Sequence, residues 1–231
     1  MLLLFLYNMK EIFMFKKLFT CGCLLSMCHM SGVLGASAHQ TRSLSSVECA
    51  SQLKPCLMAI QKVPEARQLI ETVQKEGWVR VVVNNTHLSN QFGAYWDGSN
   101  RTIAISVTSD NTQGDIIASI IFELHNASVD SKFDYLDSLA AAGQIDREGY
   151  IRAVEYIEFQ NSISAHNIAE KGIKMGVFPV RARLHVYRNF EEHYYYQQVG
   201  GHSAYIGKNF DMVAPKYNKG YAVRAASPRS I

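Results

Sequence analysis

Apolar and polar residues follow two different spacings along the chain, and the changes between them predict the order of its elements. From Pro64 the apolar positions of PEARQLIETVQKEG recur every three or four residues, and this pattern ends at Gly77. Proline in a first turn and glycine just past a last turn are typical of helix ends, so this segment is predicted to be a helix. The next segment, WVRVVVN, is rich in β-branched residues and predicts a strand.

The stretch GAYWDGSNRTIAISV predicts a β-hairpin, with residues 97–100 as the turn and residues 102–107 as the return strand. A helix is then expected over residues 115–127, after a polar segment that offers several capping side chains. Its apolar residues form a broad surface, which is typical of a central core helix. They are Ile116, Ile117, Ile120, Ile121 and Leu124.

Three further helices are predicted from the same signals. The segment KFDYLDSLAAAG ends at Gly143, and Asp146 begins a long helix that Gly176 closes. A last helix is expected over residues 184–198, followed by a loop-rich segment.

This order of elements predicts a single domain of the α+β class over residues 64–221. Residues 39–63 are expected to be a Ser-rich lead-in, irregular with some helix, and residues 222–231 a disordered tail.

Residues 1–38 differ in composition from the rest of the chain. Their three Lys precede the apolar run LFTCGCLLSMCHMSGVLG, and Ala-Ser-Ala follows at residues 36–38. A positive segment, a short apolar core and small residues before a cleavage point predict a secretory signal peptide that is removed before His39. The candidate start residues are Met1, Met9 and Met14. We therefore expect an exported protein, periplasmic or secreted, without a membrane span once the signal is removed.

The chain from residue 39 onward has 193 residues (231 minus 38), enough for one domain with a hydrophobic core. It carries 20 Lys and Arg against 19 Asp and Glu, because the leader takes three Lys and one Glu from totals of 23 and 20. Nucleic acids and anionic membranes usually require a basic excess, so this near-balance argues against both as partners.

Two cysteines remain after the leader, Cys49 and Cys56. An exported protein meets an oxidising environment, so this even pair predicts a disulfide. Seven residues of straight helix would separate the two by about 10 Å, which is too far for a bridge. Pro55 indicates a bend that would bring them together, and two separate buried thiols are the alternative.

The segment IIFELHNA, residues 120–127, lies on the predicted core helix. With the element order around it, FELHNA resembles the HELGHA-type sequence of minimal zincin metallopeptidases, over about half of the chain from Pro64 to Gly176. In that family two His four residues apart bind zinc, and the Glu between them is the general base on the zinc-bound water. The resemblance implies a zincin-like core and places Glu123 at the catalytic glutamate. From the residues alone, the alternative is a core-helix carboxylate paired with a Lys, an Arg or a backbone amide.

The sequence departs from this family at both zinc positions. Phe122 cannot bind a metal, and Asn126 is a poor zinc ligand compared with imidazole. His125 lies one residue before the second position, which rotates it by about 100° around the helix. It therefore does not replace the missing ligand, and it fits a histidine at the edge of the core. Zinc stays open as a cofactor although the standard motif does not support it, and the sequence neither specifies nor excludes another metal.

The following helix carries Glu155 and Glu158, three residues apart on neighbouring parts of one face. The glutamate-ligand branch of the family takes its third zinc ligand from this helix. From the residues alone, Glu155 fits a solvated face, whereas Glu158 is expected to be partly buried. A buried carboxylate requires a partner. The candidates are His125, Asn126, His166 and a C-terminal Arg.

The C-terminal stretch FEEHYYYQQVGGHSAYI contains His193 and His202. The Gly-Gly pair before His202 permits backbone angles closed to other residues, so a tight loop is expected to present this imidazole. Folded over the core helix, such a loop would complete a cleft in which a carboxylate and an imidazole act as acid and base. The residues lining it would be Glu123, Glu158, His202 and Tyr205. Alternatively, the tyrosines pack the domain edge and His202 is a surface residue.

Two hypotheses of function stay open. The first is an exported relative of metallopeptidases or other hydrolases, without the standard zinc ligands, in which Glu123 and His202 are catalytic. Its binding candidates are Glu155, Glu158, His125 and Tyr205. The second is a non-catalytic exported protein that binds a protein, a peptide or a polysaccharide through its aromatic C-terminal segment, because Tyr is common at interfaces. The tyrosines of this segment are Tyr187, Tyr194, Tyr195, Tyr196 and Tyr205.

Overall fold

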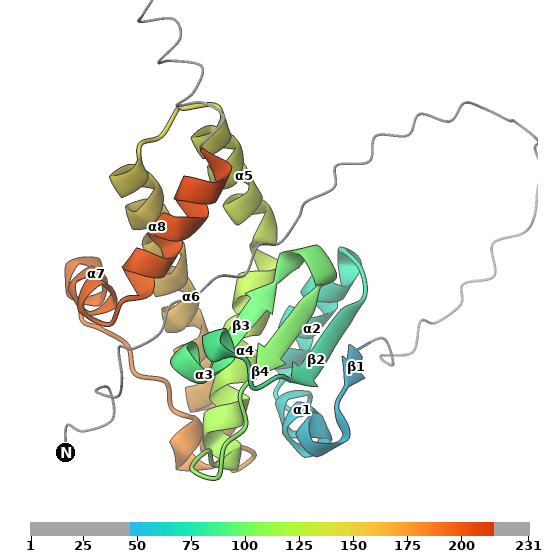
Figure 1. Cartoon of the computed structure of the whole chain (residues 1–231). Coiled ribbons are helices and arrows are strands. Elements are labelled where there is room, and N and C mark those ends of the chain that lie inside the picture. The colour runs from blue at the N-terminus through green and yellow to red at the C-terminus, as the bar shows by residue number, and fades with distance from the viewer. Residues whose placement is uncertain (1–46, 215–231) are drawn as a thin grey trace, which may run out of the picture. The chain divides into compact units, whose positions relative to one another are not determined.

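The computed structural model describes residues 47–214 (Figure 1). The predictions for the leader, the first part of the lead-in and the tail fall outside these described residues. Within them the chain is α+β as predicted, with eight α-helices and one small mixed sheet.

The sheet has four strands among the described residues, in the spatial order β1-β2-β4-β3. They are β1 (Val47–Cys49), β2 (Val79–Val83), β3 (Ala94–Asp97) and β4 (Thr102–Ile105). The first three in this order run parallel, and β3 lies antiparallel to β4 at one edge. The predicted hairpin is therefore confirmed, with Trp96 opposite Ile103 and a 3₁₀ turn between the strands.

The helices cover the sheet and extend beyond it. They are α1 (Lys54–Ile60), α2 (Pro64–Lys75), α3 (His87–Phe92), α4 (Gln113–Ser128), α5 (Asp130–Ala141), α6 (Arg147–Lys174), α7 (Phe190–Val199) and α8 (His202–Val213). As predicted, Asp146 caps α6, since its side chain accepts a hydrogen bond from the Gly149 amide at 2.7 Å. Among residues 47–214, none of these helices is long and apolar enough to cross a bilayer.

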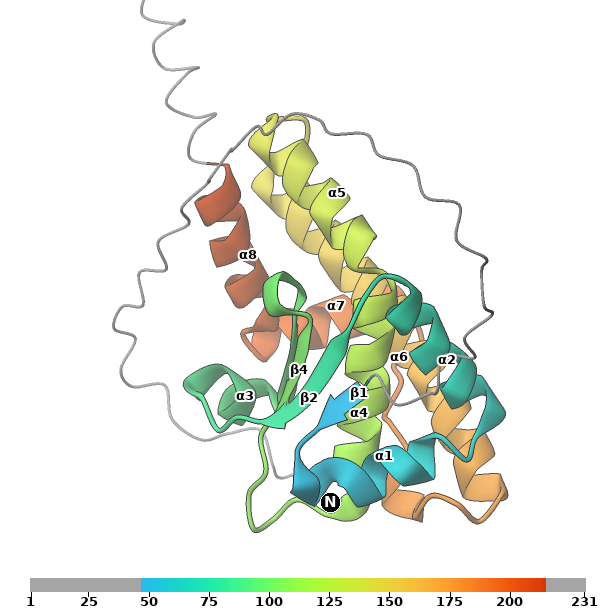
Figure 2. The same ribbon diagram turned by 90° about the vertical axis from the view of Figure 1, so that its right-hand side faces the viewer.

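The predicted core helix, α4, is the centre of the larger hydrophobic core. A capping box fixes its first turn, because the Thr112 and Asp115 side chains each bond the backbone amide of the other residue. The helix runs along the sheet, with α1 and α2 beside it and α6 packed against it (Figure 2). Four of its predicted apolar residues are at most 1% exposed: Ile117, Ile120, Ile121 and Leu124.

A second, smaller hydrophobic cluster holds the C-terminal helices together. It joins residues of α5, α6, α7 and α8, including Leu136, Tyr194 and Ile206. The 28-residue helix α6 contributes to both clusters, with Val154 in the smaller one and Ile168 in the larger one. In consequence, α6 is the element that the two cores share.

Three sequence predictions differ from the structure. The expected lead-in contains β1, which is too short to show an alternating pattern. The last predicted helix begins six residues later than expected, where the Asn189 side chain accepts a hydrogen bond from the Glu192 amide and caps α7. The segment after it, which was expected to be loop-rich, is helix α8. The Gly-Gly pair before this helix indicated a loop in the sequence.

The two cysteines of the predicted disulfide lie on β1 and α1, near the start of the described residues. Cys49 ends β1 and is partly buried, whereas Cys56 lies in α1 and is buried. Both are free thiols in the structure. Burial raises the pKa of both thiols, and the charge of Cys56 raises the pKa of Cys49 further. The bridge between them remains a prediction.

Candidate functional site

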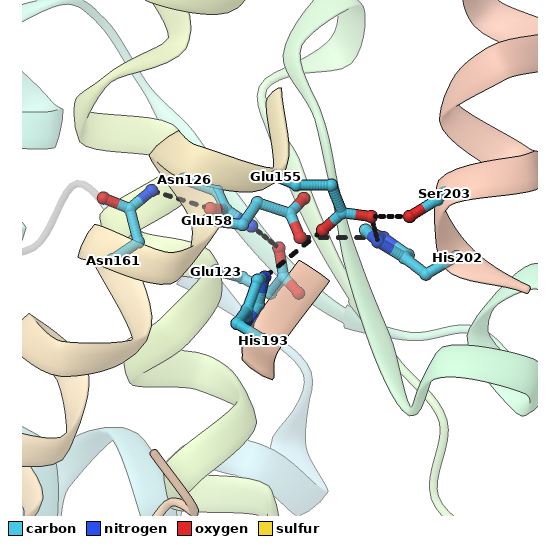
Figure 3. Close-up of polar contacts among 8 residues, drawn as sticks. All are labelled: Glu123, Asn126, Glu155, Glu158, Asn161, His193, His202 and Ser203. Carbon is cyan, nitrogen blue, oxygen red and sulfur yellow. Dashed lines mark hydrogen bonds and ion pairs between the residues drawn. The ribbon is translucent and has the colours of Figure 1, made fainter. Parts of the chain in front are cut away.

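Carboxylate, imidazole and hydroxyl side chains from four helices meet in one place, which we call the Glu–His cluster. It consists of Glu123 from α4, Glu155 and Glu158 from α6, His193 from α7, and His202 and Ser203 from α8. Figure 3 shows their polar ends directed toward one another. The cluster lies where α4 and α6 meet the two C-terminal helices. It brings together Glu123, Glu155, Glu158 and His202 from the sequence-predicted set.

Glu155 is the fully buried member of the cluster, at 0% exposure. Its Oε1 accepts a hydrogen bond from Ser203 Oγ at 2.7 Å and contacts His202 Nδ1 at 3.2 Å. Its Oε2 contacts His193 Nε2 at 3.3 Å. Burial alone would raise its pKa, but the hydrogen bonds from the two imidazoles outweigh burial and lower it to about 2. Glu155 is therefore a carboxylate anion, and the expectation of a solvated face was wrong.

His202 is the first residue of α8, directly after Gly201 in the left-handed conformation at φ 83°. The predicted tight turn is thus present, and it starts a helix. While Nδ1 faces Glu155, Nε2 lies 3.6 Å from Oε2 of Glu158. Burial lowers the pKa of His202, but the charge of Glu158 and the hydrogen bond to Glu155 outweigh it and raise the pKa to about 9. The imidazole is accordingly a cation at neutral pH.

Glu158 is partly buried, as predicted, with 16% of its side chain exposed. Its charged partner is His202, whereas the sequence suggested His125, Asn126, His166 or an Arg. Burial raises its pKa, His202 opposes this effect, and the negative charge of Glu155 adds to it. Within residues 47–214 no Lys or Arg forms an ion pair with any of the three cluster carboxylates.

Glu123 is 5% exposed and lies beside the other two carboxylates. Asn126 Nδ2 donates a hydrogen bond to its Oε2 at 3.0 Å, and Asn161 Nδ2 donates to Asn126 Oδ1 at 2.9 Å. Burial raises the pKa of Glu123 to about 8. The Asn126 hydrogen bond lowers this pKa, whereas the negative charge of Glu158 raises it further. The Glu123 carboxyl is therefore mostly neutral at pH 7, unlike Glu155.

Two other candidates lie outside the hydrogen-bonded part of the cluster. His125 does not contact these carboxylates, its Nε2 is buried without a hydrogen-bond partner among the described residues, and burial lowers its pKa to about 4. Tyr205 lies one turn after His202, where its ring contacts Phe92 at 5.7 Å between centroids. Phe92 also packs edge-on against the His202 ring at 5.1 Å, so an aromatic pair borders the cluster.

Sequence reasoning did not assign a role to His193, Ser203 or Asn161. One signal was available, because Glu155, Glu158 and Asn161 repeat at intervals of three on one helix, and polar residues at this spacing line one face. The pair Glu123 and Asn126 has the same spacing on α4, which packs against this face. The contacts of His193 and Ser203 depend on how α7 and α8 pack, and no local pattern specifies that.

The zinc positions of the resembled family do not fit a metal in this fold. Phe122 packs against the larger hydrophobic core. The amide of Asn126 is buried and both of its polar atoms are hydrogen-bonded, since Nδ2 donates to Glu123 and Oδ1 accepts from Asn161. Neither side chain therefore offers a free ligand atom, and α4 provides no zinc site of the standard kind.

Comparison with known proteins gives no relative, since no family model matches the chain and no similar curated protein or solved structure was found. The function of the Glu–His cluster must therefore be argued from its own geometry.

Proposed function

We propose that the Glu–His cluster is the acid–base centre of an exported hydrolase, a zincin-like relative that acts on amide or peptide bonds without the standard zinc ligands. The observation that carries the proposal is the meeting of Glu123 with an imidazole cation and two further carboxylates at an edge that remains partly exposed. The side chains of Glu158 and His202 are 16% and 18% exposed, so solvent reaches this side of the cluster.

In this proposal Glu123 exchanges a proton with the substrate. With a pKa of about 8, a fraction of Glu123 is ionised near neutral pH. That carboxylate can take a proton from a water molecule as the water oxygen bonds to the carbonyl carbon, and the carboxyl so formed can donate this proton to the leaving amine as the C–N bond breaks. Its burial and the Asn126 hydrogen bond hold it in one orientation. Glu123 is thus the catalytic residue, as the family resemblance implied.

His202 supplies the positive charge on the opposite side of the cluster. A fixed cation stabilises negative charge that develops on a carbonyl oxygen during acyl transfer. Glu155 acts through His202 as a positioning residue, because its carboxylate binds Nδ1 and leaves Nε2 directed away from it. Ser203 and His193 hold Glu155 in turn.

The test is hydrolysis of fluorogenic peptide and amide libraries by the purified protein and its Glu123→Gln variant. Glutamine has the shape of a neutral glutamic acid and can accept the same Asn126 hydrogen bond, so we expect the variant to fold normally. Activity should fall by about 100-fold or more, since general acid–base catalysis contributes about that much. Glu71→Gln, on the exposed surface of α2, is the matched control. Equal activity in wild type and Glu123→Gln would refute the proposal.

A second candidate function is ligand binding by an aromatic surface on α7. Tyr195, Tyr196 and Val199 are 60%, 48% and 68% exposed, and the Tyr187 ring stacks on Tyr196 at 5.2 Å. Tyr194 is not part of this surface, because it is buried and its hydroxyl binds Glu148. Peptide and glycan arrays probed with wild type and Tyr196→Ala would test it, with loss of a specific signal in the variant as the expected result.

A further inference from the structure

The Glu–His cluster holds three carboxyl groups, and among the described residues their only ion-pair partners are two imidazoles. Glu155 and Glu158 lie one helix turn apart, and the charge of Glu155 raises the pKa of Glu158. Glu158 accepts no hydrogen bond from the described residues and has only the ion pair with His202 at 3.6 Å. A carboxylate that is mostly buried normally requires a closer partner.

Three side chains of the cluster are arranged as ligands of a single ion. Glu155, Glu158 and His202 each direct one ligand atom into a space in which these atoms lie within 4.8 Å of one another. The His202 ring lies between the two carboxylates, with Nδ1 at 3.2 Å from Glu155 and Nε2 at 3.6 Å from Glu158, and only one of these nitrogens would bind the ion. Tetrahedral zinc with bonds of 2.0–2.1 Å separates its ligand atoms by about 3.4 Å. Starting from separations of up to 4.8 Å, the ligand atoms would have to approach one another by up to about 1.4 Å to share one ion, a movement within reach of side-chain rotation.

We propose that Glu155, Glu158 and His202 bind one divalent transition-metal ion, with Zn²⁺ as the best match. Two carboxylates and one neutral imidazole match the charge of such an ion and belong to the ligand types that Zn²⁺ and Mn²⁺ accept. The ligands come from α6 and α8, and none comes from α4, where the resembled family places its two His. The site is thus a different ligand set in the same region of the fold.

The surroundings of the three ligands support this assignment. Metal-binding carboxylates are usually held by further hydrogen bonds. Here Ser203 Oγ donates to Glu155 at 2.7 Å, and His193 Nε2 contacts its other oxygen. The Phe92 and His202 rings also pack against each other edge-on. Because Glu158 and His202 are partly exposed, an ion has access, and water or substrate could occupy a fourth coordination position.

This inference concerns the same cluster as the proposed hydrolase but does not require hydrolytic activity. Glu123 is a neighbour of the ion and not a ligand, so metal binding and catalysis depend on different residues. If both hold, the ion would take the place of the His202 proton as the positive charge of the site.

The experiment is a calorimetric titration of the chelator-treated, full-length protein with Zn²⁺ alone, with Mn²⁺ and Mg²⁺ as comparison ions. We expect one Zn²⁺ per chain and the weakest binding for Mg²⁺, which prefers oxygen ligands. Glu158→Gln and His202→Gln should each weaken zinc binding by more than the 10- to 100-fold typical of a supporting residue. Ser203→Ala, which removes only a support of Glu155, should weaken it by about 10-fold.

Glu71→Gln is the matched control, because the wild-type side chain is exposed on α2, which contributes no residue to the cluster. X-ray absorption at the zinc edge of the wild-type protein needs no variant and should show one imidazole and only light oxygen or nitrogen ligands. No zinc binding by folded wild type, or unchanged binding in Glu158→Gln, would overturn the inference.

Glu123→Gln separates this inference from the proposed function. It should keep zinc binding and lose hydrolysis. Hydrolysis that depends on Glu123 in a protein that binds no zinc would leave the hydrolase proposal standing and refute the metal site. Zinc binding without any hydrolysis would support the metal site and refute the hydrolase proposal.

Discussion

At the scale of single residues, the three cluster carboxylates differ because their surroundings differ. Glu155 is the most buried, yet its pKa falls to about 2, since three donors stabilise its charge. Glu123 is similarly buried, but its hydrogen bonds to the Asn126 side chain and the Trp96 backbone do not offset desolvation, and its pKa rises to about 8. Sequence alone identified both as candidates but not their opposite ionisation, because the donors come from other helices.

The buried amides Asn126 and Asn161 should stabilise the protein as a unit. Asn126→Ala removes the donor to Glu123 and leaves the Asn161 amide without its acceptor, so we expect a loss of about 1–3 kcal/mol in the free energy of unfolding. Asn161→Ala should reduce the free energy of unfolding by less in the Asn126→Ala variant than in the wild-type protein. Urea unfolding of both single variants and the double variant measures this coupling, and additivity within about 0.5 kcal/mol would contradict it.

His125 should make the protein sensitive to mild acid. Its pKa is about 4 in the folded chain against an ordinary 6.5, so between these values the unfolded chain binds a proton that the folded chain does not. The contribution of neutral His125 to stability is therefore fully present above pH 6.5 and is lost as the pH falls toward 4. We expect His125→Gln to flatten this part of the pH profile, by on the order of 1–2 kcal/mol after allowance for partial exposure. Thermal unfolding of the wild-type protein and of His125→Gln at pH 7.5, 5.5 and 4.5 tests this prediction. The same loss of stability with falling pH in both proteins would argue against a role of His125.

At the scale of elements, the sequence predicted those that carry their own signals. The β3–β4 hairpin, α4 and α6 have turn residues, caps and long apolar periodicity, and all three were confirmed. The strand β1 and the helix α8 were missed because their positions depend on partners distant in sequence: β1 on β2, and α8 on α6. The cluster was consequently predictable on its α4 and α6 side and not on its α7 side.

The start of α4 has no room for a side chain at Gly114. A Cβ there would lie 2.6 Å from the backbone of Arg181 and Ala182, which cannot move aside like a flexible side chain. We expect Gly114→Ala to destabilise the protein by about 1–3 kcal/mol through overpacking, although alanine favours helices. Gln113→Ala, at the exposed neighbouring position, is the control for helix propensity. Chemical denaturation measures both, and a stabilised Gly114→Ala variant would contradict the expected clash.

If the protein is exported, as we propose, the segment from β1 to α1 should form a disulfide. Cys49 and Cys56 are close enough for the charge of one thiol to affect the pKa of the other, and an oxidising compartment favours their bond. We expect the intact mass of the exported protein to be lower than that of the reduced chain by the mass of two hydrogens. Two thiols that react with a maleimide in denaturant without a reductant would show that the pair stays reduced.

At the scale of the whole described molecule, two hydrophobic clusters meet at the polar site. The larger one joins the sheet with α4, and the smaller one joins α5, α7 and α8. The Glu–His cluster takes residues from α4 on one side and from α7 and α8 on the other, with α6 between them. A site at such a junction is sensitive to any small displacement of one group of helices against the other.

The sharing of α6 also affects how the chain opens. Because its first half is packed in one core and its second half in the other, neither core can come apart without loosening a stretch of this helix. The middle of α6, which carries Glu155 and Glu158, should therefore be among the last parts to release its amide hydrogens to solvent. The residues that hold the most costly buried charge would then lie on the slowest-opening segment of the chain.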